Sequence, residues 1–94
     1  MDPDRPRLQV GIGWIGIEIR SEPNVIRTVR GYAPYVVVAE IGTQLDYDWL
    51  ISAKSICDAL EPLRESNSNS FMGLRLNVRR SSTDRFAQYE IASL

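Results

Sequence analysis

Apolar residues alternate with polar or small ones over much of this chain, and that period of two constrains the fold more than any other feature. Over residues 8–14 the large apolar side chains occupy even positions, and over residues 15–19 they occupy odd ones. A period of two is typical of a β-strand, and a single change of phase is what a β-bulge produces. A tight turn near Gly13 between two short strands is the alternative. Both interpretations predict β structure over 8–20.

Four later segments also have strand character. Residues 35–41 are apolar on both faces, whereas residues 71–79 alternate so that one face is apolar and the other is polar. A short polar turn then leads into residues 85–94, which predicts a hairpin. Segment 22–30 is ambiguous: its β-branched content favours a strand, but a Ser cap, an early Pro and a closing Gly fit a short helix. We favour the strand.

One long amphipathic helix is predicted from about 46 to 64. Asp46 is a suitable N-cap, and Asp48 would lie in the first turn, where the helix dipole favours an anion. The apolar positions that share one arc at 3.6 residues per turn are Trp49, Leu50, Ala53, Ile56, Cys57, Leu60 and Leu63. Pro62 should bend or end the helix near its last turn. This helix is expected to pack on one face of the sheet.

Together these patterns predict an α+β fold, with a mostly antiparallel sheet of about five strands and the element order β-β-β-α-β-β. Ninety-four residues fit a single domain over 1–94, in which 1–7 form a loose N-terminal arm. A lone cysteine, the lack of a signal-peptide pattern and the lack of a long apolar run lead us to expect a cytoplasmic protein with no membrane association.

The residue types available limit the chemistry. The chain has no histidine, which is the side chain most often used for proton transfer near neutral pH and the commonest metal ligand. Cys57 falls on the predicted buried arc, which favours a core residue over a nucleophile. We therefore expect no cofactor and no metal. One functional hypothesis, which we rank third of three, is a small-ligand or enzymatic pocket between sheet and helix that uses Glu40, Tyr47 or Asp48.

Residues 11–16 match the dinucleotide-binding pattern G-x-G-x-x-G. That pattern requires a helix that opens at the glycines and an acidic residue about twenty positions later. Here a strand pattern continues after the glycines, and no acid lies close to the expected place. The glycines are better explained as part of a bent strand.

Residues 30–33, with the sequence Arg-Gly-Tyr-Ala, resemble the opening of the RNP1 segment of RNA-recognition-motif domains. In that family strand aromatics stack on RNA bases, so the resemblance would imply an RNA-binding sheet. Pro34 departs from the pattern, which has an aromatic strand residue there. The alternative, which we favour, is a turn that leads into a core strand.

Basic residues gather near one predicted strand and give a second hypothesis, binding of nucleic acid. The candidates are Phe71, Arg75, Arg79, Arg80 and Arg85. A basic strand face with an aromatic residue could hold a nucleic-acid backbone and stack a base. The net charge of −1 favours instead a face that is solvated or paired with acidic groups.

Our first hypothesis is a small non-enzymatic module that associates with itself or with another protein. One helix can cover only one face of a sheet, whereas the segments 8–19 and 35–41 carry apolar side chains on both faces. A second copy related by a two-fold axis is the commonest cover for such a face, so we expect a homodimer. The candidate interface residues are Trp14, Ile15, Tyr32, Tyr35 and Ile51.

Overall fold

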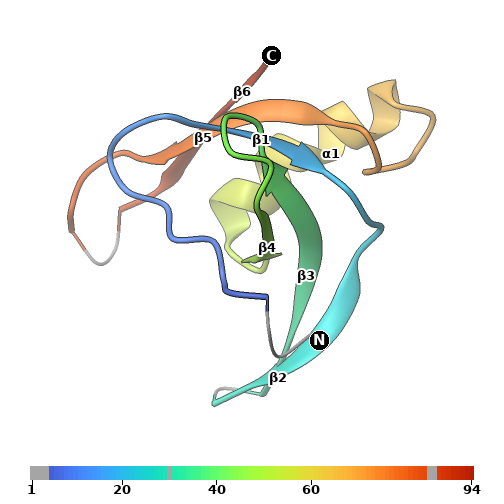
Figure 1. The fold of residues 1–94 in the computed structure, drawn as a ribbon. Helices are drawn as coiled ribbons and strands as arrows, with labels where there is room; N and C mark the ends of the chain where they lie inside the picture. Colours follow the sequence, from blue (N-terminus) through green and yellow to red (C-terminus); the bar gives the residue numbers. More distant parts are fainter. Residues whose placement is uncertain (1–4, 30, 85–86) are drawn as a thin grey trace.

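A computed structural model describes residues 5–29, 31–84 and 87–94, which form strands and one helix (Figure 1). In chain order the elements are β1 (Ile15–Ile19), β2 (Asn24–Thr28), β3 (Gly31–Glu40), β4 (Asp46–Leu50), α1 (Lys54–Ser66), β5 (Arg75–Arg80) and β6 (Tyr89–Ser93). The strands join in one six-stranded antiparallel sheet. The predicted α+β class is confirmed, and the described residues form a single compact domain.

Strand β3 organises the sheet because it has partners along both edges. On one edge its first half pairs with β2 and its last residues pair with β1. On the other edge it pairs with β4. The sheet continues from β1 through β5 to β6, which gives the order β2-β3-β1-β5-β6 with β4 beside β3. Strands β1 and β2 therefore follow one edge of β3 in succession.

The gap between β1 and β2 is closed by a side chain. The backbone N–H of Arg20 donates to the carbonyl oxygen of Val37 at 2.7 Å. The N–H of Val37 then donates to the hydroxyl of Ser21 at 2.9 Å. The Ser21 hydroxyl takes the place of a backbone acceptor. The edge of β3 that faces β1 and β2 therefore keeps its hydrogen bonds where the chain passes from β1 to β2.

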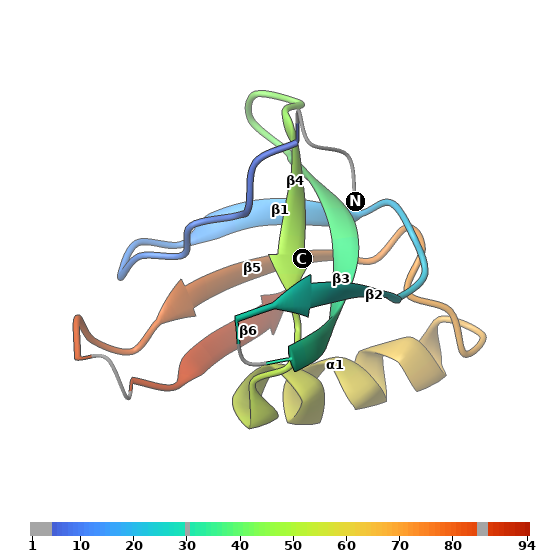
Figure 2. The same ribbon diagram turned by 90° about the horizontal axis from the view of Figure 1, so that it is seen from below.

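Alternate residues of the strands supply the core. Ile17 lies opposite Leu76, and Ile19 lies opposite Val38, so these side chains share one face of the sheet. The buried cluster consists of Ile17, Ile19, Val36, Val38, Trp49, Ile51, Ile56, Leu60, Leu76 and Val78. Helix α1 lies along one side of the sheet, and its close backbone contacts are with β6 (Figure 2).

The predicted helix start is wrong. Residues 46–50 form β4, and α1 begins only at Lys54, after an N-cap at Ala53 that has no side-chain capping bond. Asp46 and Asp48 therefore do not cap a helix. In β4 the aromatic residues Tyr47 and Trp49 lie opposite Val38 and Val36, so their packing against β3 outweighs the helical spacing.

Helix α1 otherwise follows its predicted stripe. Ile56 and Leu60 are fully buried, and Leu63 is half-buried against the core. Pro62 lies inside the helix, which continues to Ser66. Cys57 is the exception, because it is exposed in the first turn rather than buried late in the helix.

The N-terminal arm is not loose over its described part. The N–H of Asp48 donates to the carbonyl oxygen of Pro6 at 2.9 Å, and the N–H of Leu8 donates to the carbonyl oxygen of Asp48 at 2.8 Å. The arm thus follows the free edge of β4, and the side chains of Leu8 and Val10 pack against the core. Residues 1–4 lie outside the described residues.

Other predicted boundaries shift. Within 8–20 only β1 is a strand, and the chain bends at residues 12–13, so neither a bulged strand over 8–20 nor two short strands joined by a tight turn is observed. The strand interpretation of 22–30 is confirmed by β2. The predicted strand at 71–79 begins later, at Arg75, because residues 67–74 form a loop around Glu22, whose carboxylate accepts from the N–H of Phe71. The last strand is shorter than 85–94 and is β6.

Candidate interaction surface

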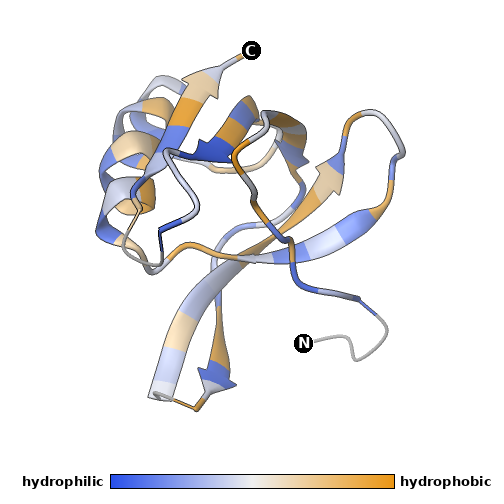
Figure 3. Ribbon diagram, turned by 90° about the vertical axis from the view of Figure 1, so that its left-hand side faces the viewer, coloured by the Kyte–Doolittle hydropathy of each residue, from blue (hydrophilic) through white to orange (hydrophobic). Residues whose placement is uncertain are grey.

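The hairpin of β2 and β3 projects from the rest of the domain (Figures 1 and 3). Among the named elements, β2 has close backbone contacts only with β3. Three large apolar side chains of this hairpin are exposed: Val25 at 60 %, Val29 at 104 % and Tyr32 at 77 % of their accessible surface. These residues, with the β2 backbone, are called the hairpin surface below.

The faces of the hairpin follow from its register. Val25 lies opposite Pro34, and Arg27 lies opposite Tyr32, so these four side chains share one face. Ile26 points to the other face, where it is buried. The exposed face is therefore part apolar and part basic, with Arg27 beside the Tyr32 ring.

The outer edge of β2 offers backbone groups to a further strand. The carbonyl oxygen of Pro34 accepts from the N–H of Ile51, on the β4 side, and Pro34 has no N–H of its own. The opposite residue, Val25, therefore exchanges no backbone bonds with β3, and its N–H donates instead to the side-chain oxygen of Asn24 at 2.8 Å. The backbone groups of Val25, and of Arg27 two residues on, point outward.

A shallow hollow of about 350 Å³ lies beside the turn end of the hairpin. Its lining comes from the arm, the hairpin and the end of β4: Arg7, Thr28, Val29, Tyr32, Ala33, Leu50 and Ser52. Arg7 is the one charged residue of this lining in the described part of the chain, so no acid–base pair converges there among those residues. The hollow extends the hairpin surface toward the body of the domain.

The structure separates the predicted interface residues. Tyr35 and Ile51 are both 5 % exposed, so they belong to the interior and not to a free surface. Trp14 is 46 % exposed and Ile15 is half-buried, but both lie beyond the β1 residues that pair with the last residues of β3. Tyr32 lies near the other end of β3. These candidates therefore do not form one patch, and only Tyr32 belongs to the hairpin surface.

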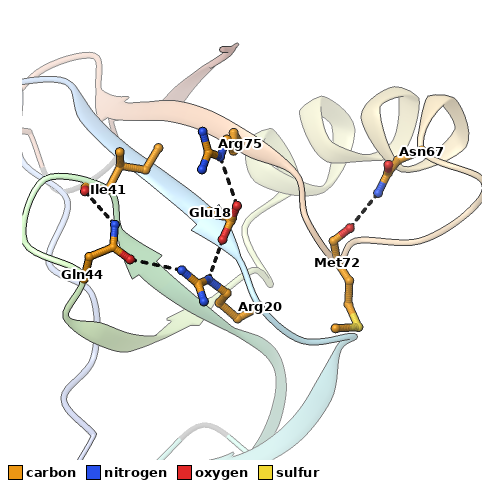
Figure 4. A network of polar contacts seen from close by, with 7 residues as sticks. All are labelled: Glu18, Arg20, Ile41, Gln44, Asn67, Met72 and Arg75. Carbon is orange, nitrogen blue, oxygen red and sulfur yellow. Dashed lines mark hydrogen bonds and ion pairs between the residues drawn. The ribbon is translucent and has the colours of Figure 1, made fainter.

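The basic face predicted for nucleic acid is occupied by ion pairs. Nε of Arg75 donates to Glu18 at 3.0 Å, and Nε of Arg20 lies 2.6 Å from the other oxygen of the same carboxylate (Figure 4). The hydrogen bond from Arg75, helped by the charge of Arg20, holds the pKa of Glu18 below its usual value. Gln44 extends the network through a bond from Arg20.

Arg79 is similarly engaged. Its guanidinium lies 4.4 Å from the centroid of the Trp14 ring and 3.3 Å from the carboxylate of Glu90. Arg80 donates to the carbonyl oxygen of Asp84 at 2.5 Å, and Phe71 lies in the loop before β5 with the Arg64 guanidinium over its ring. Arg85 lies outside the described residues. The described members of this set, Phe71, Arg75, Arg79 and Arg80, thus do not form one open cationic face.

The residues named for an enzymatic pocket are also dispersed. Asp48 is buried and paired with Arg5 at 2.5 Å, whereas Tyr47 lies on the opposite face of β4 against the core. Glu40 ends β3 and pairs with Ile17. Among the described residues no group of three or more acidic or cysteine side chains could hold a metal ion.

Two sequence motifs take structural roles. Gly11 and Gly13 precede β1 and Gly16 lies in it, so no helix opens at the G-x-G-x-x-G pattern. In the segment that resembles RNP1, Gly31 has a φ of 111°, a conformation that glycine adopts readily, and it starts β3. The turn predicted at residues 31–34 is therefore wrong, because these residues already belong to β3 and pair with β2. Residue 30 lies outside the described residues.

Comparison of the chain with protein-family models, curated proteins and solved structures finds no match, so no family is assigned. The helix described here is too short and too polar to cross a membrane. Sequence reasoning missed Val25 and Val29 as surface residues. Their alternation with Arg27 was the available signal, because a charged residue between two valines of the same parity marks an exposed face.

Proposed function

We propose that this protein is a self-associating interaction module without an active site, and that it acts through the hairpin surface. The observation that carries the proposal is the exposure of Val25, Val29 and Tyr32 on a hairpin whose outer strand is held by β3 alone. Contiguous exposed apolar side chains typically mark sites of protein interaction. Tyrosine is enriched in such sites because it adds apolar area and a polar group.

The backbone of the same hairpin supports this function. An outer strand with outward N–H and C=O groups is a template for pairing with another strand. Natural proteins usually protect such strands with charge or proline; within β2 itself the one charged residue is Arg27, and Pro23 precedes the strand. Side chains and backbone on this hairpin thus favour the same kind of partner, a polypeptide.

The test is the mass in solution, measured by size-exclusion chromatography with light scattering at micromolar concentration. We expect the wild-type protein to be a defined oligomer and Tyr32→Arg to be a monomer with an unchanged circular dichroism spectrum. The matched control is Leu45→Arg, because Leu45 is also exposed, at 56 %, but lies outside the hairpin. A wild-type monomer, or equal effects of the two variants, would contradict the proposal.

A further inference from the structure

The outer edge of β2 has no strand partner in the described chain, although the N–H of Val25 donates to the side-chain oxygen of Asn24. The outward groups are those of Val25 and Arg27, whereas Ile26 bonds inward to Ala33 of β3. An added antiparallel strand can form backbone hydrogen bonds with β2 only if residues whose N–H and C=O groups point toward β2 lie opposite Val25 and Arg27. This condition leaves few ways for two copies of β2 to pair.

Three antiparallel registers satisfy the hydrogen-bond condition between two copies with the two-fold axis within residues 25–27 of β2. If Val25 opposes itself, Arg27 opposes Pro23 of the second copy, which has no N–H to donate. If Arg27 opposes itself, two like charges face each other at the two-fold axis. If Ile26 opposes itself, Val25 meets Arg27 in both directions and all five residues of β2 overlap.

We infer that the partner of the hairpin surface is a second copy of this chain, joined by antiparallel β2–β2 pairing with the two-fold axis at Ile26. The inference rests on the proposed function and specifies its partner. In this register the N–H of Val25 leaves the side chain of Asn24, and the N–H and C=O of Val25 exchange bonds with Arg27 of the second copy. The reverse holds by symmetry. The two sheets become one continuous sheet.

Side chains support the same register. Directly opposed residues share a face, so Arg27 lies between Tyr32 of its own β3 and Val25 of the second copy. The aliphatic part of the arginine can cover both apolar side chains while its guanidinium stays in solvent. Val25 of one copy and Tyr32 of the other thus lie on the two sides of the same Arg27 side chain. No two like charges are directly opposed in this register.

Disulfide cross-linking between two copies tests the register directly. In a Cys57→Ser background, Val25→Cys and Arg27→Cys proteins are prepared separately, mixed under reducing conditions and then oxidised. Opposed Cα atoms in a hydrogen-bonded pair lie about 5.5 Å apart, within the range of a disulfide. In a dimer of either variant alone, the Cα atoms of the two cysteines lie roughly 8 Å apart, because they are offset by two residues along neighbouring strands.

We expect a cross-linked dimer of mixed mass from the mixture and none from either variant alone. Self-linking of Val25→Cys or of Arg27→Cys would identify another register and overturn the inference. A wild-type oligomer that Tyr32→Arg dissociates, but that gives no mixed cross-link, would also overturn the inference while the proposed function stands. A wild-type monomer would overturn both.

A backbone variant gives an independent measurement. Arg27→Pro removes an outward N–H, and proline is tolerated on an outer strand where that group does not bond to the sheet. Arg27→Ala removes the same side chain and keeps the N–H. We expect Arg27→Pro to be monomeric and Arg27→Ala to remain a dimer, with both folded by circular dichroism. Equal masses for the two variants would count against strand pairing.

Discussion

Nε of Arg5 donates to Oδ1 of Asp48 at 2.5 Å, and this ion pair joins the N-terminal arm to β4 across 43 positions of sequence. The carboxylate of Asp48 is fully buried, whereas the Arg5 side chain keeps 22 % of its surface accessible. The second oxygen of Asp48 has no partner among the described residues. Without Arg5 of the arm, the buried carboxylate of Asp48 would have no cationic partner among the described residues.

Removing that cation should destabilise the protein. We expect Arg5→Ala to lower the free energy of unfolding by about 3 kcal/mol, because a buried charge left without its partner is costly. The double variant Arg5→Ala with Asp48→Asn should recover part of the loss, since no buried charge then remains. Urea denaturation measures both.

The exposed pair Lys54–Asp58 provides the control for this experiment. Lys54→Ala should leave the urea midpoint unchanged, because solvent screens an exposed pair. A loss in Arg5→Ala no larger than in Lys54→Ala would show that the Arg5–Asp48 pair does not hold the arm.

Acid should loosen the loop at residues 67–74. Glu22 accepts hydrogen bonds from the hydroxyl of Ser70 and from the N–H of Phe71, and the Ser70 bond is the main cause that lowers the pKa of Glu22 below 4.5. A carboxyl whose pKa is lowered in the folded state stabilises the folded protein at pH values above its unfolded pKa. This stabilisation disappears as the pH falls through the folded pKa.

The urea midpoint should therefore fall as pH is lowered from 4.5, where the unfolded carboxyl begins to bind protons ahead of the folded one. Glu22→Gln should show a shallower fall, and Ser70→Ala should change the slope in the same direction. Parallel curves for the three proteins would exclude this role of Glu22.

Gly31 should tolerate substitution poorly. Its φ of 111° is a conformation that other residues seldom adopt, although a Cβ there would meet no atom within 4 Å. We expect Gly31→Ala to cost about 1–2 kcal/mol from backbone strain alone. Gly42→Ala, also with open space around it and no positive φ, should be neutral in the same denaturation experiment. Equal costs would remove backbone strain as the reason for glycine at this position.

Cys57 should react in the folded protein. Its side chain is exposed in the first turn of α1, and its thiol donates to the carbonyl oxygen of Ile51 at 2.9 Å. We expect complete reaction with Ellman's reagent without denaturant. Reaction only after addition of urea would show that the thiol is buried, as the helical stripe first suggested.

The sequence predicted fold class better than element boundaries, and the segment 46–53 shows why. Trp49 lies in an alternating pattern with Tyr47 and Ile51, but it also continues the helical spacing that runs through Ile56 and Leu60. Periodicity alone cannot separate two patterns that share residues. The contact of Trp49 with Val36 of β3 decides the outcome, and that contact depends on the tertiary fold.

Surface residues were harder to predict than core residues. Tyr35 is predicted at the surface because one helix covers only one sheet face, and Ile51 because it lies off the stripe of a helix that in fact begins at Lys54. The structure also packs Leu8 and Val10 against the core. Arg75 looked free because Glu18 is 57 positions away in sequence. In both cases the missing information was a long-range pairing that no local pattern encodes.

Strand β3 extends from the hairpin surface into the core, and local stability should change along it. Its first residues, Gly31 and Tyr32, are exposed, whereas Val36 and Val38 have no exposed surface. Backbone amides near Tyr32 should therefore exchange with solvent deuterium much faster than those near Val38. Binding at β2 would slow exchange first at the hairpin end, so a single strand can report both the integrity of the core and the occupancy of the edge.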